Sequence, residues 1–371
     1  MQLRVMTIDG VRRFLERLKG QYRVIGPKAE GGVFVFKELQ GVEEVVLDYP
    51  IALYPIKGFL LPPKEEYLRY RKDGKVDVFA MVEEVPPTVF FGIHPCDLHS
   101  LWLLDEAFIK DGTDGLYEAK RKKFVFVVLD CLSPCDQYAF CRDVGTLYAD
   151  GYDVLLTRTT AEEISSKGGK AVTSLSADGG KLLGGPLYIV RSHTEKGEAI
   201  LRDHADLVVL DVDEKEVVDK IYEEREEVFG RRLKLEKDEI PDVLWRAYDS
   251  PYWEEVASKC LNCGACNFVC PTCYCFDVVE DVDLNLKEGR RFRTWDSCML
   301  TNFALVASGE NFRPKRFQRL RHRFLRKGKY LLDRYGKMGC VGCGRCTRHC
   351  LVKINPIEVY NTLYNRVQAE V

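Results

Sequence analysis

The sequence predicts two domains, an α/β domain over residues 1–245 and a mainly helical, cysteine-rich domain over residues 246–371. A length of 371 residues suits two domains, and the hydrophobic fraction of 46% is typical of a globular chain. Short apolar segments alternate with helical patterns in the first part, which favours a partly parallel sheet. In the second part, eight cysteines form two runs of identical spacing.

The elements of the first domain follow from local patterns. Residues 7–19 are predicted to form a helix, because apolar residues recur on one face. Residues 124–130 form a continuous apolar run, as in a buried parallel strand. Further strands are predicted at residues 32–36, 44–47, 89–93 and 207–212, helices at 97–108 and 214–230, and a loop or hairpin turn in the glycine-rich stretch 166–186.

The second domain carries two matched cysteine runs. The first is Cys260, Cys263, Cys266 and Cys270, and the second is Cys340, Cys343, Cys346 and Cys350. This is the spacing of bacterial-type [4Fe–4S] ferredoxins, in which the fourth cysteine of each run serves the other run's cluster. The sequence therefore predicts two clusters with crossed ligands. Cluster 1 would use Cys260, Cys263, Cys266 and Cys350, and cluster 2 would use Cys340, Cys343, Cys346 and Cys270.

Two other interpretations of these cysteines are weaker. Structural zinc sites usually combine Cys-x2–4-Cys pairs or cysteine with histidine, which this spacing fits poorly. Disulfides between thiols so close in sequence would be strained. The charged first 25 residues lack the apolar core of a secretory signal, and no apolar run could span a bilayer. Fifteen cysteines in such a chain indicate a reducing compartment, so a cytoplasmic protein without membrane contact is expected.

The link between the runs indicates which kind of ferredoxin domain to expect. Residues 271–339 form a far longer connection than the β-hairpin links of compact two-cluster ferredoxins. The link is rich in helix formers, notably at residues 298–307 and 316–335, so an α-helical ferredoxin-type domain is predicted. Leu351 follows the second run where proline is usual, which removes no ligand.

Four further cysteines lie in the first domain. Cys96 follows the predicted strand 89–93, while Cys131, Cys135 and Cys141 follow the predicted strand 124–130. Because ligand sites in open α/β sheets gather at the carboxyl ends of strands, these four thiols could bind a third metal site, with [4Fe–4S] favoured over zinc. The alternative is that they are unrelated buried thiols.

The remaining candidates allow more than one interpretation. Cys273, Cys275 and Cys298 could bind another cluster, donate weak hydrogen bonds to cluster sulfurs, or simply pack in the core, and the last two are favoured. His94 and His99 flank Cys96 and receive no role.

A basic amphipathic helix is predicted within residues 313–329. Its basic face could be plainly solvated, offset the negative charge of the clusters, or dock a partner through Arg319, Arg323 and Arg326. Nucleic-acid binding is not expected at a net charge of −2.

No residues are assigned to catalysis. The chain has neither a G-x-x-x-x-G-K-[ST] phosphate loop nor a G-x-G-x-x-G turn after a strand, so no nucleotide site is expected. It also shows no convincing set of acid, base or nucleophile residues. Electron transfer through thiolate-bound clusters needs no such catalytic residues, so the cysteine runs favour an electron-transfer function.

With these motifs in place, the chain resembles the β (iron–sulfur) subunit of archaeal cytosolic sulfhydrogenases and NAD(P)-linked hydrogenases, and the related iron–sulfur subunit of anaerobic sulfite reductases. The resemblance covers most of the chain and is weakest at residues 145–245. The motifs that carry it are residues 92–98, the cysteines from Cys131 to Cys141, the Cys-Pro-Thr-Cys-Tyr-Cys-Phe string within 260–276, residues 295–298 and residues 339–346.

The resemblance implies a non-catalytic subunit of a multisubunit oxidoreductase. It would relay electrons between a flavin/NAD(P)H-binding subunit and a hydrogenase or a sulfur- or sulfite-reducing subunit. Related subunits occur in electron-bifurcating complexes, which stay open as an alternative. A stand-alone reductase of sulfur compounds that acts on a cluster, or on Cys273, Cys275 and Cys298, is the other alternative.

Overall fold

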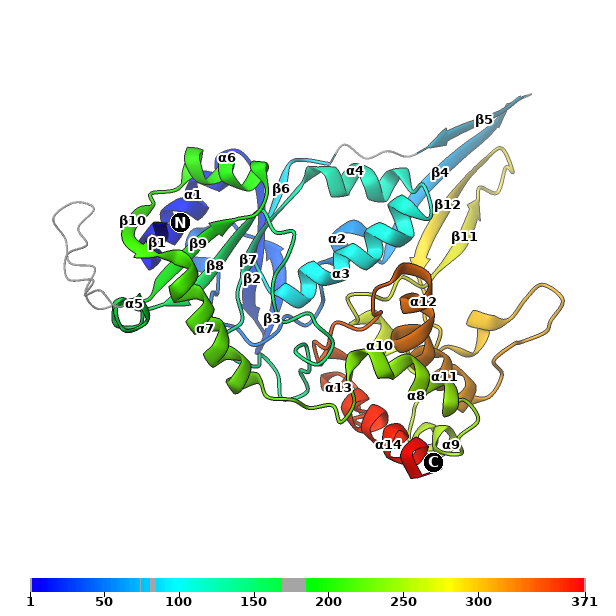
Figure 1. The fold of residues 1–371 in the computed structure, drawn as a ribbon. Coiled ribbons are helices and arrows are strands. Elements are labelled where there is room, and N and C mark those ends of the chain that lie inside the picture. Colours follow the sequence, from blue (N-terminus) through cyan, green and yellow to red (C-terminus); the bar gives the residue numbers. More distant parts are fainter. Residues whose placement is uncertain (1, 74, 81–84, 169–184, 370–371) are drawn as a thin grey trace.

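The computed structural model describes residues 2–73, 75–80, 85–168 and 185–369 (Figure 1). Most of the glycine-rich stretch 166–186, for which a loop was expected, lies outside the described residues.

An eight-stranded mixed sheet forms the core of the N-terminal part. Its strand order is β10-β1-β9-β8-β7-β6-β2-β3. The four strands β8, β7, β6 and β2 run parallel to one another, and antiparallel strands extend the sheet on both sides. The strand bounds are β1 Gln2–Thr7, β2 Arg23–Glu30, β3 Val33–Glu38, β6 Thr88–Ile93, β7 Phe124–Leu129, β8 Val154–Thr159, β9 Leu187–Ser192 and β10 Val208–Asp213. The predicted partly parallel sheet is therefore confirmed.

Helices pack around this sheet, with bounds α1 Ile8–Lys19, α2 Lys57–Leu60, α3 Pro95–Asp105, α4 Gly115–Lys123, α5 Ala161–Gly168, α6 Glu195–His204 and α7 Glu214–Phe229. α1 begins where the Thr7 hydroxyl accepts a hydrogen bond from the Gly10 amide at 3.0 Å, a usual N-cap contact. α7 ends at Gly230, whose φ of 53° favours glycine. Both helices agree with the sequence prediction.

The strand expected at residues 44–47 is wrong. Val42–Glu44 forms a short 3-10 turn instead. The Glu44 carboxylate accepts hydrogen bonds from the Gln40 amide at 2.8 Å and from the Lys28 ammonium at 2.6 Å. These side-chain contacts close the turn, and the apolar residues after it pack against the main core without a ladder of their own.

A second sheet joins the two halves of the chain. Its order is β11-β12-β4-β5, and all of its pairs are antiparallel. The strands are β4 Lys64–Asp73, β5 Lys75–Ala80, β11 Phe276–Val282 and β12 Glu288–Trp295. Figure 1 shows this sheet projecting from the molecule. The link between the cysteine runs therefore contains a β-hairpin. This hairpin was not predicted, because a helical link was expected.

Short helices surround the cysteine runs in the C-terminal part. Their bounds are α8 Ile240–Arg246, α9 Tyr252–Ser258, α10 Ala265–Phe268, α11 Arg316–Leu325, α12 Leu331–Tyr335, α13 Arg345–Arg348 and α14 Pro356–Ala369. α11 continues through a π-turn at Arg326–Tyr330 into α12, which confirms the helix predicted at residues 316–335. The helix expected at 298–307 is wrong, because Thr301–Ala304 forms only a 3-10 turn.

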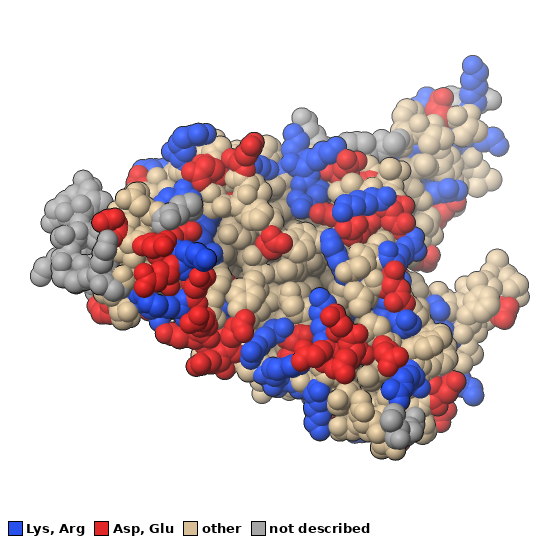
Figure 2. All heavy atoms as spheres, in the orientation of Figure 1, with Lys and Arg blue, Asp and Glu red and all other residues tan. Residues whose placement is uncertain are grey.

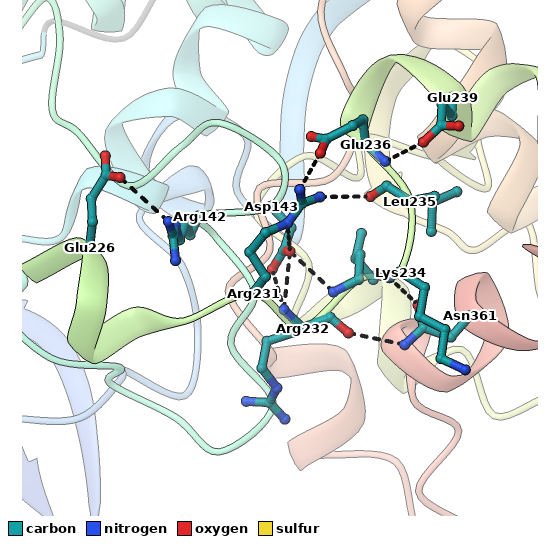
Figure 3. Close-up of polar contacts among 11 residues, drawn as sticks. Arg142, Asp143, Glu226, Arg231, Arg232, Lys234, Leu235, Glu236, Glu239 and Asn361 are labelled. Atoms are coloured by element: carbon teal, nitrogen blue, oxygen red, sulfur yellow. Dashed lines mark hydrogen bonds and ion pairs between the residues drawn. The ribbon is translucent and has the colours of Figure 1, made fainter.

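The segment between α7 and α8 is held from both sides (Figure 3). The buried Asp143 carboxylate accepts hydrogen bonds from the amides of Arg232 and Leu233, both at 3.1 Å. On the other side, the Asn361 side chain accepts from the Lys234 amide at 2.8 Å and donates to the Arg232 carbonyl at 3.0 Å. The boundary at residue 245 stays a prediction, and one apolar core includes residues from both sides of it.

Charges are mixed on the face shown in Figure 2, where the carboxylates of α7 form an acidic band. In the described part of the chain, no helix combines the length and the apolar character needed to cross a membrane.

Candidate iron–sulfur sites

The two cysteine runs fold alike. Gly264 and Gly344, with φ of 77° and 76°, begin the short helices α10 and α13 in the middle of each run. The Cys260 sulfur accepts a hydrogen bond from the Asn262 amide at 3.4 Å, and the Cys340 sulfur accepts one from the Gly342 amide at 3.5 Å. Each run is thus a tight loop whose backbone amides point at cysteine sulfurs, and such hydrogen bonds tune cluster potentials.

A first cavity lies inside the first run. The cysteines that line it are Cys260, Cys263, Cys266, Cys346 and Cys350. Its other lining groups include Met299, Leu320 and the Arg323 guanidinium. All four thiols predicted for cluster 1 therefore face one space, although Cys350 belongs to the other run.

A second cavity lies inside the second run. The cysteines that line it are Cys270, Cys340, Cys343 and Cys346. Apolar residues such as Phe324 and Tyr360 close it, together with the ammonium group of Lys327. The structure thus brings together the set predicted for cluster 2, again with the fourth cysteine supplied by the other run.

These cavities suit clusters better than single metal ions. Within the described residues, no three His, Cys, Asp or Glu side chains come close enough together to hold one ion. Each thiolate of a cubane binds a different iron atom, so a cluster needs a wider set of ligands than tetrahedral zinc does. The thiol-lined cavities therefore fit [4Fe–4S] groups and argue against the zinc interpretation.

Three cations of the basic helix point inward. Arg319, Arg323 and Lys327 follow one another at intervals of four residues along the helical segment and are 3%, 6% and 5% exposed. Arg319 donates to the carbonyls of Met299, Arg313 and Pro314. A docking face that uses Arg319 and Arg323 is therefore wrong, because both guanidinium groups are buried and donate hydrogen bonds to groups inside the protein.

The cysteine thiolates balance these buried cations. Burial opposes the charged form, yet the thiolates of Cys266 and Cys346 raise the pKa of Arg323 well above its ordinary value. For Lys327, burial is likewise outweighed by the thiolates of Cys270 and Cys273, and its pKa is also raised. Both residues stay cationic beside the cavities.

The four N-terminal cysteines also lie together. The hydrogen bond with Cys135, burial, and the nearby thiolates of Cys96 and Cys141 raise the pKa of Cys131. The same hydrogen bond lowers the pKa of Cys135. Cys96 is buried with Cys343 of the second run in one apolar cluster, and Cys135 packs against it. Cys141 packs with Cys131 in a separate small cluster. The loops at the carboxyl ends of β6 and β7 thus place the predicted thiols in two small clusters, which the Cys131–Cys135 contact connects.

An open cavity with about 900 Å³ of empty space lies beside Cys131 and Cys135. His94 also lines it, stacks on Tyr49 with ring centroids 4.3 Å apart and is 3% exposed. Among the described residues, its Nδ1 atom finds no hydrogen-bond partner. His99 instead contacts the Tyr148 carbonyl at 2.6 Å, outside this group.

The three remaining cysteines lie near the first run. The Asn267 side chain donates to the Cys298 sulfur at 3.0 Å and accepts from Arg323 Nε at 3.2 Å. The buried Lys57 ammonium donates to the Cys273 carbonyl at 2.8 Å. Cys298 is itself buried. These contacts favour a supporting role for the group, since Asn267 connects Cys298 to the cation between the cavities.

The ion pair between Asp97 and Arg345 was not predicted from the sequence. Both side chains are fully buried, and the guanidinium makes two parallel contacts to the carboxylate, at 2.9 Å and 2.8 Å. Asp97 follows Cys96, and Arg345 lies between Cys343 and Cys346. The only local signal was an arginine and an aspartate that each adjoin a candidate ligand.

Comparison with known proteins agrees with this geometry. Residues 259–354 match the family described as the 4Fe-4S dicluster domain. Together with the paired cavities, this match defines an iron–sulfur protein. The chain is also 33% identical over 349 residues, 93% of each chain, to sulfhydrogenase 2 subunit beta of Pyrococcus furiosus. The protein therefore belongs to the sulfhydrogenase beta-subunit family, which confirms the resemblance. No solved structure matches the chain.

Proposed function

We propose that this protein is the iron–sulfur electron-transfer subunit of a hydrogenase-type complex and carries two [4Fe–4S] clusters in residues 246–371. The observation that supports this most is the pair of cavities, each lined by the first three cysteines of one run and the fourth of the other, with Cys346 also on the first cavity. In this assignment Cys270 serves cluster 2 and Cys350 serves cluster 1. The clusters supply one-electron chemistry, and the protein supplies thiolates, burial and nearby cations.

The proposed partners are a flavin/NAD(P)H-binding subunit and a hydrogenase or sulfur-reducing subunit. Two observations support them. The relative is named as one subunit of a sulfhydrogenase, and the present sequence carries no phosphate-binding glycine loop with which to bind a nucleotide. The chain would therefore receive electrons from a partner and pass them to another.

We also propose a third cluster at Cys96, Cys131, Cys135 and Cys141. The contact between Cys131 and Cys135 supports it, as does the packing of Cys96 and Cys135 beside Cys343 and of Cys131 beside Cys141. A third cluster here would extend the relay into the α/β part of the chain.

Anaerobic purification of the intact complex tests the proposal. Three cubanes correspond to about twelve iron atoms per chain and two to about eight. Co-purification with a flavoprotein and a hydrogenase or reductase, together with no NAD(P)H oxidation by the isolated chain, is the expected result. Zinc in place of iron would refute the cluster assignment. Turnover by the chain alone would instead favour the stand-alone reductase.

A further inference from the structure

The loop that carries Cys141 lies directly on the second cysteine run. The Phe140 amide donates to the Gly342 carbonyl at 2.7 Å, and the Thr146 hydroxyl donates to the Val341 carbonyl at 2.8 Å. A Cβ atom on Gly342 would lie 2.5 Å from the Cys141 amide nitrogen, closer than real contacts allow. The backbones of the two cysteine loops are therefore in contact.

The Asp97–Arg345 ion pair joins the same two sites at a second point. Arg345 also donates from Nε to the Ala52 carbonyl at 2.8 Å, so its guanidinium is fixed on several sides. The pair has no solvent exposure, and Cys96 packs with Val341 and Cys343 of the second run in one buried cluster. The N-terminal site and cluster 2 are thus neighbours.

Cluster 2 also adjoins cluster 1. Cys346 and Arg323 line both ferredoxin cavities, so the two spaces share part of their walls. Neither ferredoxin cavity shares a lining residue with the cavity beside Cys131 and Cys135 in the described part of the chain. The link to the N-terminal site therefore rests on the hydrogen bonds and the ion pair described above, and these are made by the second run.

The three sites differ in their exposure to solvent, and the second site is the most enclosed. Leu261 and Leu351 on the first cavity are 58% and 78% exposed, and Cys263 is exposed as well. The cavity beside Cys131 and Cys135 is open. The second cavity is enclosed by buried residues such as Phe140, Phe324 and Tyr360.

From this arrangement we infer that the three sites form a single line, with the N-terminal site and cluster 1 as two surface ports and cluster 2 as the obligatory middle relay. The inference rests on the proposed third cluster. Each step moves one electron, so that one cluster is oxidised while its neighbour is reduced, and no bond or proton is exchanged. The first electron comes from the reduced flavin of a partner, and the last leaves to a second partner at the other port.

Magnetic coupling between reduced clusters tests this order in the full chain. Reduced [4Fe–4S] clusters are paramagnetic, and their coupling weakens steeply with distance. Cys270→Ser removes a ligand of the middle cluster, and we expect the two remaining signals to become simple and uncoupled. The matched variant Cys263→Ser removes a ligand of an end cluster, and we expect coupling to persist between the remaining two.

Coupling that survives in Cys270→Ser after loss of the middle cluster would overturn the order but leave the relay function intact. About eight iron atoms in the wild-type chain, instead of about twelve, would overturn the third cluster and the order together. If Cys270→Ser fails to fold, a potentiometric titration of wild-type protein replaces it. The linear order then requires two strong pairwise couplings and one weak one, and three equal couplings would contradict it.

Discussion

At the scale of single residues, Arg323 has the most unusual position. It is buried, lines both ferredoxin cavities, and finds its counter-charge in cysteine thiolates. A buried cation near a cluster stabilises the reduced form, which carries one more negative charge. Lys327 is also a buried cation beside cysteine thiolates, but of the two ferredoxin cavities it lines only the second. The two residues should therefore affect the clusters differently.

We expect Arg323→Met to lower the midpoint potentials of both clusters and Lys327→Met to lower mainly that of cluster 2. A tenfold change in the reduced-to-oxidised ratio corresponds to about 59 mV for one electron. Potentiometric EPR of the anaerobic protein measures the shift. Arg321→Met is the control, since Arg321 pairs with Asp249, which is 92% exposed. Equal shifts in Lys327→Met and Arg321→Met would contradict the assignment.

Gly342 offers a second test at this scale. Its φ of 64° and the close Cys141 amide both forbid a side chain. Gly336 has a similar φ of 66°, but a Cβ atom placed on it would meet nothing within 4 Å. Gly336→Ala is therefore the control that measures only the backbone cost of a side chain at positive φ, about 1–2 kcal/mol. We expect Gly342→Ala to lose more stability than Gly336→Ala and to lose iron from the N-terminal site. Unfolding curves and iron analysis measure both effects, and equal losses would argue against tight loop contact.

At the scale of elements, the β-hairpin in the link shows the limit of local patterns. β12 pairs with β11 along the chain and with β4 from the other half of the molecule. Arg293 of β12 contacts Glu65 and Asp114, both far away in sequence. Elements with their own apolar periodicity, such as α1, β6 and β7, could be predicted. A hairpin stabilised by distant partners could not.

Hydrogen exchange should separate the strands of this second sheet. β12 has a partner on each side, whereas β11 and β5 are the edges of the sheet. Amides on edge strands open to solvent more readily than central ones. We expect slow exchange in β12 and faster exchange in β11 and β5, measured by mass spectrometry of the holoprotein. Equal protection of β11 and β12 would mean that another molecule covers the edge.

At the scale of the whole molecule, the cysteine sites depend on contacts between the two parts of the chain. The cysteine spacing was enough to predict which cysteines share each ferredoxin cavity, because repeats of this kind encode local loops. The contact between Cys96 and the second run could not be read from the sequence. It depends on Asp97 and Arg345, which are 248 residues apart.

Asp97→Asn should therefore destabilise the entire protein. It leaves the Arg345 charge buried without a partner, and breaking such a pair typically costs about 3–5 kcal/mol. Asp249→Asn removes the charge of an aspartate that is 92% exposed and pairs with Arg321, and should cost about 1 kcal/mol or less. Anaerobic unfolding of the holoprotein compares the free energies of unfolding of the two variants. Similar losses of stability would show that the buried pair does not hold the two parts of the chain together.

The unequal exposure of the two ferredoxin sites has a consequence for damage by air. Dioxygen reaches a cluster through the surface that covers it, and Cys263 and Leu351 leave the cavity proposed for cluster 1 close to the solvent. The cavity proposed for cluster 2 lies behind Phe324 and Tyr360. On brief aeration we expect cluster 1 to bleach first, followed by the EPR signal of cluster 2, and the reverse sequence would contradict this. Once a partner covers the exposed port, the clusters should bleach more slowly in air, because the partner limits the access of dioxygen.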